Sequence, residues 1–193
     1  MNNQPLLKTA LKYGAIAGLA NFVFFLLIYF MSKNPLGGWS WAGIWISIIV
    51  IIMGTKFHRN NDLGGYMTYG RGLGIGMLIT LFSTILFCLL IQSFGTLIDA
   101  SLLEMQKNEI LAGMQAMEEN KESMIKFMGE SKFDLVMTEM QKAHDKMTMV
   151  DVSFSQFEVK VVGGFIYSLI ISAFLRKKRP MFEEQPSSPT INN

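Results

Sequence analysis

The sequence predicts an all-α integral membrane protein, a four-helix bundle with a helical hairpin inserted between spans three and four. Half of the 193 residues are hydrophobic and only 17% are charged, and the mean hydropathy is +0.32. Soluble domains carry about 25% charged residues, so this composition argues against a soluble globular enzyme. The apolar residues gather in uncharged blocks, three of which reach the roughly 20 residues that a helix needs to cross a bilayer.

The first three spans are predicted at about residues 13–32, 35–55 and 72–98. The first apolar run is longer than that of a typical signal peptide, and no A-x-A-like cleavage site follows it, so we expect a retained helix. The fourth span, predicted at residues 159–179, has an uncharged core of only 15 residues, 161–175. It reaches the required length if the helix begins near Phe157, with Glu158 and Lys160 extending toward the outer headgroups.

The charged residues predict the orientation. Basic residues flank span one at Lys8 and Lys12, dominate the loop 56–71 and follow span four at 176–179. The positive-inside rule therefore places both termini and the loop 56–71 in the cytoplasm of a bacterial inner membrane, and residues 99–158 outside it. Basic ends of this kind favour anionic lipid over nucleic acid. The tail 180–193, with three prolines, is expected to be disordered.

The insertion 99–158 is the one segment that reads as water-soluble. It carries twelve acidic side chains against six lysines, a formal charge of −6 within a chain whose net charge is +2. Its apolar residues recur at helical spacing in two segments separated by Gly129, which predicts an antiparallel hairpin of two amphipathic helices. The pairs Ser101–Glu104 and Ser131–Asp134 have the spacing of capping boxes at the two helix starts.

Nine of the fifteen methionines lie in this insertion. The simplest interpretation is that they form the apolar seam of the hairpin, because methionine packs adaptably. Two alternatives remain open: an exposed methionine face that docks a protein partner, and a Cu(I) site built from thioethers and an imidazole on one helix face. The candidates for that site are Met137, Met140, His144 and Met147.

Small residues within the spans predict close helix contacts. The motif G-x-x-x-G occurs in spans one and three, and a glycine pair lies in span four. Bundle packing is the favoured role, and self-association of the chain is the alternative. The residues are Gly14, Gly18, Gly72, Gly76, Gly163 and Gly164.

The cytoplasmic loop between spans two and three is dense in polar residues. Its Asn, Asp and Gly residues are typical of a turn, and its tyrosines are typical of the membrane interface. A small catalytic or phosphate site is the alternative interpretation, but no metalloprotease, nucleophile-elbow or phosphate-loop motif accompanies it. The residues are His58, Arg59, Asp62, Gly64, Gly65, Tyr66 and Tyr69.

The sequence offers few residues for metal binding, disulfide bonding or ion-coupled transport. The single Cys88 excludes an intrachain disulfide and a Cys-based zinc site. No Asp, Glu, Lys or Arg lies at the middle of any span as predicted here, which argues against a proton-coupled transporter or an ion pump. We therefore expect neither a cofactor nor a metal centre, and no enzymatic activity.

Two sequence motifs resemble those of a known protein family. They are L-K-Y-G-x-x-x-G at residues 11–18 and the loop G-x-K-x-x-R-x-x-x-x-G-G-Y-x-x-x-G at residues 54–70. With the Met- and Glu-rich insertion before a last helix that ends in Lys and Arg, they look like the bacterial family called domain of unknown function 4199. The resemblance implies a multi-pass protein with four spans, and it supplies no catalytic residues.

Three functions stay open at this point. The favoured hypothesis is a non-enzymatic interaction or assembly module that acts through the insertion, by binding a protein partner or by self-association. The alternatives are a component of a small-molecule or lipid transporter or channel, suggested by Asn21 and Gln92 within the spans, and a Cu(I)-binding protein.

Overall fold

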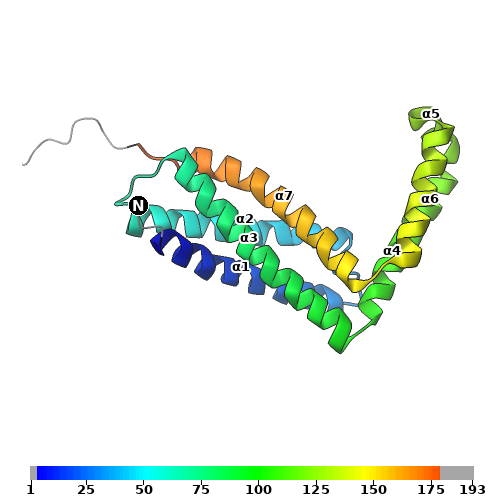
Figure 1. The fold of residues 1–193 in the computed structure, drawn as a ribbon, viewed down its shortest axis with the longest axis horizontal. Helices are drawn as coiled ribbons and strands as arrows, with labels where there is room; N and C mark the ends of the chain where they lie inside the picture. The colour runs from blue at the N-terminus through cyan, green and yellow to red at the C-terminus, as the bar shows by residue number, and fades with distance from the viewer. Residues whose placement is uncertain (1–3, 179–193) are drawn as a thin grey trace, which may run out of the picture.

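A computed structural model describes residues 4–178, which form seven α-helices and three short 3-10 or π-helical turns. The four long helices are α1 (Gln4–Phe30), α2 (Gly43–Phe57), α3 (Tyr69–Ser93) and α7 (Met149–Leu175). They run side by side as a bundle, and the shorter helices α4–α6 project from one end of it (Figure 1). The all-α prediction is confirmed, including the insertion between the third and fourth long helices.

Four helical segments are long and apolar enough to cross a membrane: Pro5–Phe30, Gly38–Asp62, Tyr69–Ile98 and Met149–Leu175. Many of their apolar side chains face outward, among them Val23, Leu27, Leu89 and Val162, which are 56–61% exposed. A soluble bundle would bury such side chains, whereas lipid solvates them. The chain is thus a multi-span membrane protein.

The fourth span differs from the sequence-based expectation. Its helix begins at Met149, where the Thr148 hydroxyl accepts a hydrogen bond from the Asp151 amide and the Asp151 carboxylate accepts one from the Thr148 amide. This capping box satisfies amide donors that a helix start leaves free. It also makes α7 long enough for its middle, rather than its outer end, to contain Lys160.

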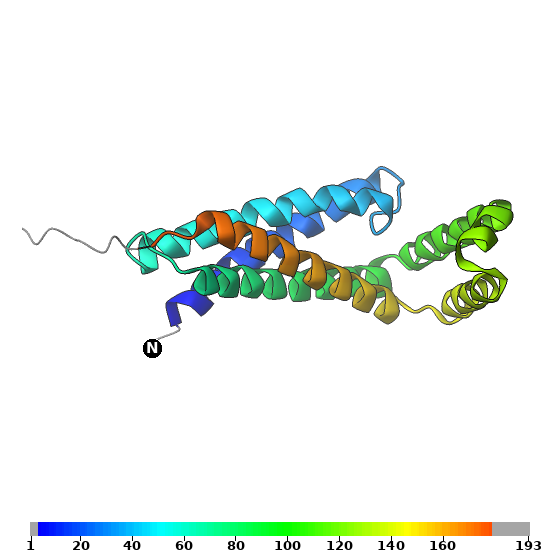
Figure 2. The ribbon, with the colours of Figure 1, turned by 90° about the horizontal axis from the view of Figure 1, so that it is seen from above.

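The insertion consists of three helices, α4 (Ser101–Glu119), α5 (Lys121–Met128) and α6 (Glu130–Lys146). The chain runs outward along α4 and α5 and returns along α6 (Figures 1 and 2). The turn is at Gly129, whose φ of 86° is costly for any other residue type. Among the nine methionines predicted to form the seam, those that lie on α4–α6 are buried or half-buried, including Met114, Met117, Met124, Met128, Met137 and Met140.

Three local predictions in the insertion were wrong. Helices α4 and α6 are capped at Ala100 and Gly129 without a side-chain hydrogen bond, so Ser101 and Ser131 each lie inside a first turn rather than before it. At the start of α4 it is the Asp99 carboxylate that accepts a hydrogen bond, from the Ser101 amide at 2.8 Å. A further break separates α4 from α5 at Asn120, whose side-chain amide donates to the Ala116 carbonyl at 2.8 Å.

The bundle contains two apolar clusters. The first surrounds Tyr13, Ile51, Ile75 and Ile79, near the end that carries the 58–68 loop. The second surrounds Phe25, Phe87, Phe94 and Met149 near the insertion, and includes the offset and edge-to-face ring contacts that aromatic side chains favour. Residues of both clusters border a cavity between α2, α3 and α7. The predicted disorder of residues 180–193 falls outside the described residues.

Candidate functional site

A cavity of about 960 Å³ lies between α2, α3 and α7, with α1 behind it and the insertion over one end. Such a volume is within the range of small-molecule sites. Figure 2 shows α2 and α7 separating toward the end that carries the insertion. Residues from all four spans and from α4 and α6 line it, including Asn21, Trp41, Ser47, Ile51, Thr80, Ser83, Phe87, Glu109, Met140, Gln156, Lys160 and Gly163.

Glycines hold α3 close to two of its neighbours. A β-carbon at Gly14 would approach Phe82 Cβ to 2.6 Å, and one at Gly18 would approach the Ser83 carbonyl oxygen to 2.9 Å. These contacts bring α1 against one side of α3.

The contact between α3 and α7 uses glycines from both helices. A β-carbon at Gly76 would lie 2.7 Å from Ser168 Oγ, one at Gly72 would lie 3.2 Å from Ser172 Cβ, and one at Gly164 would overlap Thr80. At Gly163 the nearest atoms belong to the Tyr167 ring at 3.5 Å, an ordinary contact, and this residue borders the cavity. Of the six predicted packing glycines, five therefore lie at close helix crossings and Gly163 lies on the cavity wall.

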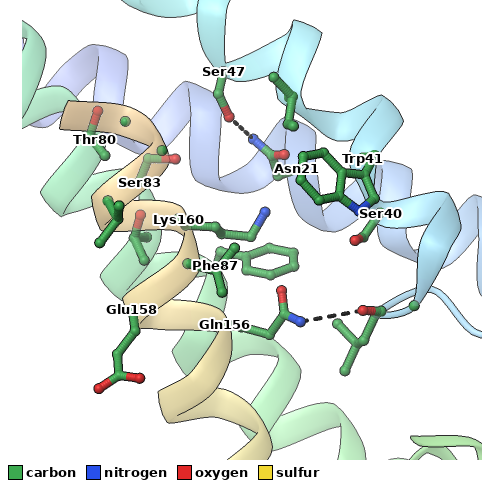
Figure 3. Close-up of a pocket in the computed structure, with 18 of the residues that line it drawn as sticks. Asn21, Ser40, Trp41, Ser47, Thr80, Ser83, Phe87, Gln156, Glu158 and Lys160 are labelled. Carbon is green, nitrogen blue, oxygen red and sulfur yellow. Dashed lines mark hydrogen bonds between the residues drawn. The ribbon is translucent and has the colours of Figure 1, made fainter. Parts of the chain in front are cut away.

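Lys160 extends from α7 into the cavity. It lies eleven residues after the first residue of α7 and fifteen before the last. Its Nζ is 4.4 Å from the centre of the Phe87 ring, a cation–π distance. Figure 3 shows Lys160 pointing toward Asn21 and Trp41, while Glu158 points away. Sequence reasoning expected Lys160 to reach the outer headgroups, and that expectation was wrong.

No carboxylate neutralises Lys160 within residues 4–178. The four ion pairs there involve His58, Lys121, Lys142 and His144. A charged side chain within a membrane-spanning bundle normally pairs with an opposite charge or serves a ligand or ion pathway. The unpaired Lys160 therefore marks the cavity as a candidate site.

The opposite wall presents polar groups. The Asn21 side-chain amide donates to the Ala17 carbonyl at 2.8 Å and to Ser47 Oγ at 3.1 Å, which fixes its orientation. The hydroxyl of Ser83, on the cavity wall, makes no hydrogen bond within the described part of the chain. It is available to a bound molecule, as is the carbonyl oxygen of Asn21.

The end of the cavity toward the insertion is closed by hydrogen bonds between the 31–38 loop and α4. The Asn34 side-chain amide donates to Gln106 Oε1 at 3.1 Å and to the Glu109 carboxylate. The Gly38 amide donates to the same carboxylate at 3.3 Å. Gln156 of α7 donates to the Leu36 carbonyl at 3.4 Å (Figure 3). The insertion thus forms a polar, acidic rim.

The four Cu(I) candidates do not form one face of α6. Met137, Met140 and His144 lie on α6, but this helix ends at Lys146, and Met147 follows in extended backbone. Met147 packs against the second apolar cluster, and His144 Nδ1 lies 3.1 Å from Asp145 Oδ1. Met140 instead borders the cavity.

The loop between α2 and α3 is a packed turn. His58 is 3% exposed, and its Nδ1 lies 2.7 Å from Asp62 Oδ2, which also accepts the Thr9 hydroxyl at 3.2 Å. The threonine hydroxyl thus donates to the carboxylate and not to the imidazole, unlike a nucleophile activated by histidine. Arg59 donates to the Leu175 carbonyl at 3.2 Å, which ties the loop to α7.

The remaining loop residues complete that turn. Gly64 and Gly65 have φ values of 64° and 85°, which favour glycine. Tyr66 lies beneath Lys177 Nζ at 5.6 Å, next to the backbone pair formed by Met67 and Lys177. Tyr69 begins α3. None of these residues faces the cavity beside Lys160.

Comparison with protein families gives one match. Residues 12–177, most of the chain, match a family described as protein of unknown function (DUF4199). No curated protein and no solved structure matches the chain.

Proposed function

The chain belongs to the DUF4199 family of proteins of unknown function, and we propose that it is a non-enzymatic membrane protein that binds an amphiphilic molecule between α2, α3 and α7. The observation that carries the proposal is the single unpaired cation, Lys160, in a cavity whose other walls are mainly apolar. Few convergent polar groups in an apolar pocket are typical of ligand sites. Among the hypotheses from the sequence, this favours a component of a small-molecule or lipid transporter or channel over the interaction module.

The cavity is also open on the bilayer side. Its border includes Val162 and Ile166 of α7, which are 60% and 48% exposed, and Trp41, which is 68% exposed. Exposed apolar side chains on a span face lipid tails. An apolar chain can therefore extend from the cavity between α2 and α7 into the bilayer without leaving a hydrophobic environment.

The proposal includes an orientation. Both termini lie in the cytoplasm and residues 99–158 lie outside a bacterial inner membrane, supported by the basic residues near the termini and in the 56–71 loop. In a Cys88→Ser background, a cysteine replacing Lys126 should react with a membrane-impermeant maleimide added to intact spheroplasts, and one replacing Lys56 should not. The reverse pattern would overturn the orientation.

Binding can be followed through Trp41. A variant that keeps Trp41 as its only tryptophan, W39F/W45F, is reconstituted in phosphatidylcholine nanodiscs and titrated with a dibrominated C18 fatty acid, whose bromines quench tryptophan fluorescence. We expect saturable quenching that unbrominated C18 fatty acid reverses.

Two glycine variants test this titration, one inside the cavity and one outside it as a matched control. Gly163→Leu fills the cavity and should abolish the saturable component. Gly74→Leu adds the same side chain where no atom lies within 4 Å of a β-carbon, outside the cavity lining, and should leave it unchanged. Linear quenching that is equal in both variants would contradict the proposal.

A second candidate function is protein binding through the insertion. Its seam methionines are turned inward, but Phe127 and Leu135 are 88% and 61% exposed. Exposed large apolar side chains on a polar hairpin favour a protein contact, either a partner or a second copy. Replacing both with serine should reduce cross-linking to that partner in native membranes. Unchanged cross-linking would rule out this contact.

A further inference from the structure

We propose that Lys160 recognises a single anionic headgroup, so that the ligand class is an acyl-chain amphiphile with one carboxylate or phosphate. This proposal rests on the proposed function of the cavity and adds its chemical specificity. It starts from an imbalance: the cavity wall supplies one cation, and no carboxylate within 4.0 Å neutralises it in the described residues.

The carboxylates that border the cavity are engaged or directed elsewhere. Glu109 accepts hydrogen bonds from Asn34 and from the Gly38 amide at the rim. Glu158 lies on α7 two residues before Lys160 and belongs to the cavity lining, but its carboxylate points away from Lys160 (Figure 3). A bound anion would thus be the partner that the protein itself does not provide for Lys160, and in a low-dielectric site such a pair is strong.

One neutral donor can complete the headgroup site. The Ser83 hydroxyl makes no hydrogen bond among residues 4–178, and Ser83 belongs to the same cavity lining as Lys160. Beside a carboxylate or phosphate it can donate one hydrogen bond, while the protonated lysine donates others. The Phe87 ring below Lys160 stabilises the cation without neutralising it.

The surroundings favour entry of the ligand from the bilayer. A water-soluble anion that approached from the rim would meet Glu109 and an insertion whose formal charge is −6, and like charges repel an approaching ion. On the bilayer side the exposed border residues Val162 and Ile166 are apolar. An amphiphile can present its anionic group to Lys160 from this side and leave its chain in lipid.

The test uses competition in the Trp41 quenching assay with three unbrominated C18 competitors: the fatty acid, the alkyl phosphate and the fatty alcohol. We expect both anions to displace the dibrominated fatty acid at concentrations at least tenfold below that of the alcohol. Lys160→Met should remove this preference, and Lys160→Arg should keep most of it. Inorganic phosphate, which lacks the chain, should not compete.

The outcomes separate the two proposals. If the alcohol competes as well as the anions, the cavity binds amphiphiles but the headgroup proposal is overturned. If Lys160→Met retains the preference for anions, a group other than Lys160 recognises the anionic headgroup, and the proposal is overturned as well. If inorganic phosphate competes, the ligand is a free anion rather than an amphiphile. If no compound gives saturable displacement, the proposed function itself fails.

Discussion

The Nζ of Lys160 lies 4.4 Å from the centre of the Phe87 ring, and these two side chains join α7 to α3 at the floor of the cavity. A lysine held against an aromatic ring and not against a carboxylate loses hydration without gaining an ion pair. An unpaired lysine in a binding site therefore lowers the free energy of unfolding of the unliganded protein.

The first prediction follows from this cost. Lys160→Met should raise the stability of the ligand-free protein by about 1–3 kcal/mol, because an apolar side chain of similar length replaces an unpaired charge. The measurement is Tm in detergent after delipidation. Lys142→Met is the matched control, because Lys142 is exposed and its pair with Glu139 contributes little. A lower Tm for Lys160→Met would show that the lysine is structural.

The second prediction concerns the crossing of α3 and α7. Gly164→Ala should destabilise the protein by about 1–3 kcal/mol, because the new methyl group overlaps the Thr80 side chain. Thr80→Ala should restore part of the loss, since the nearest remaining atom is then Thr80 Cβ at 2.9 Å. Gly74→Ala, where the space is open, is the control. Strict additivity of Gly164→Ala and Thr80→Ala in the double variant would argue against the contact.

The third prediction concerns the start of α7. Thr148→Ala should cost about 0.5–2 kcal/mol, because it removes the side-chain acceptor for the Asp151 amide. Ser131→Ala, a serine with a similar sequence pattern that lies inside α6, should cost much less. Hydrogen exchange of the Asp151 amide provides a local measurement. Equal exchange rates in wild type and Thr148→Ala would contradict the capping assignment.

The fourth prediction concerns pH. The Tyr29 hydroxyl and the Ser101 amide donate to the Asp99 carboxylate and hold its pKa below the ordinary value of 3.8. The carboxylate therefore contributes stability that is complete above pH 3.8 and is lost as the pH falls through the lower pKa of the folded state. Tyr29→Phe should lower Tm at neutral pH.

The same carboxylate allows a direct check. A carboxyl carbon NMR titration should show the pKa of Asp99 rising toward 3.8 in Tyr29→Phe, and the Tm difference from wild type should shrink at pH values below the folded-state pKa. A Tm difference that does not change with pH would mean that Tyr29 stabilises the bundle through ring packing alone, for example against Phe94.

The spans could be predicted from the sequence because each contains enough apolar residues to cross a bilayer. The role of the glycines in helix packing could be predicted because helices that cross closely leave no room for a side chain at the contact. Helix starts were less predictable. A Ser with an acid three residues later occurs inside helices as well as before them, and Thr148–Asp151 has that same pattern. Only the backbone conformation separates a cap from a first turn.

Lys160 could not be placed from its position in the sequence. Near the end of a span, a lysine usually extends toward the headgroups, and a helix that began at Phe157 would have put it there. Because α7 begins at Met149, Lys160 lies near the middle of the helix and faces Phe87. The Thr148-x-x-Asp151 spacing was present in the sequence, but only the backbone conformation shows that it caps the start of α7.

The most direct test of the cavity is native mass spectrometry of the protein released from its own membranes in a mild detergent. We expect wild type and Lys142→Met to carry a bound acidic amphiphile of defined mass, and Lys160→Met and Gly163→Leu to lack it. Wild-type protein without such an adduct, or an adduct present equally in all four proteins, would contradict it.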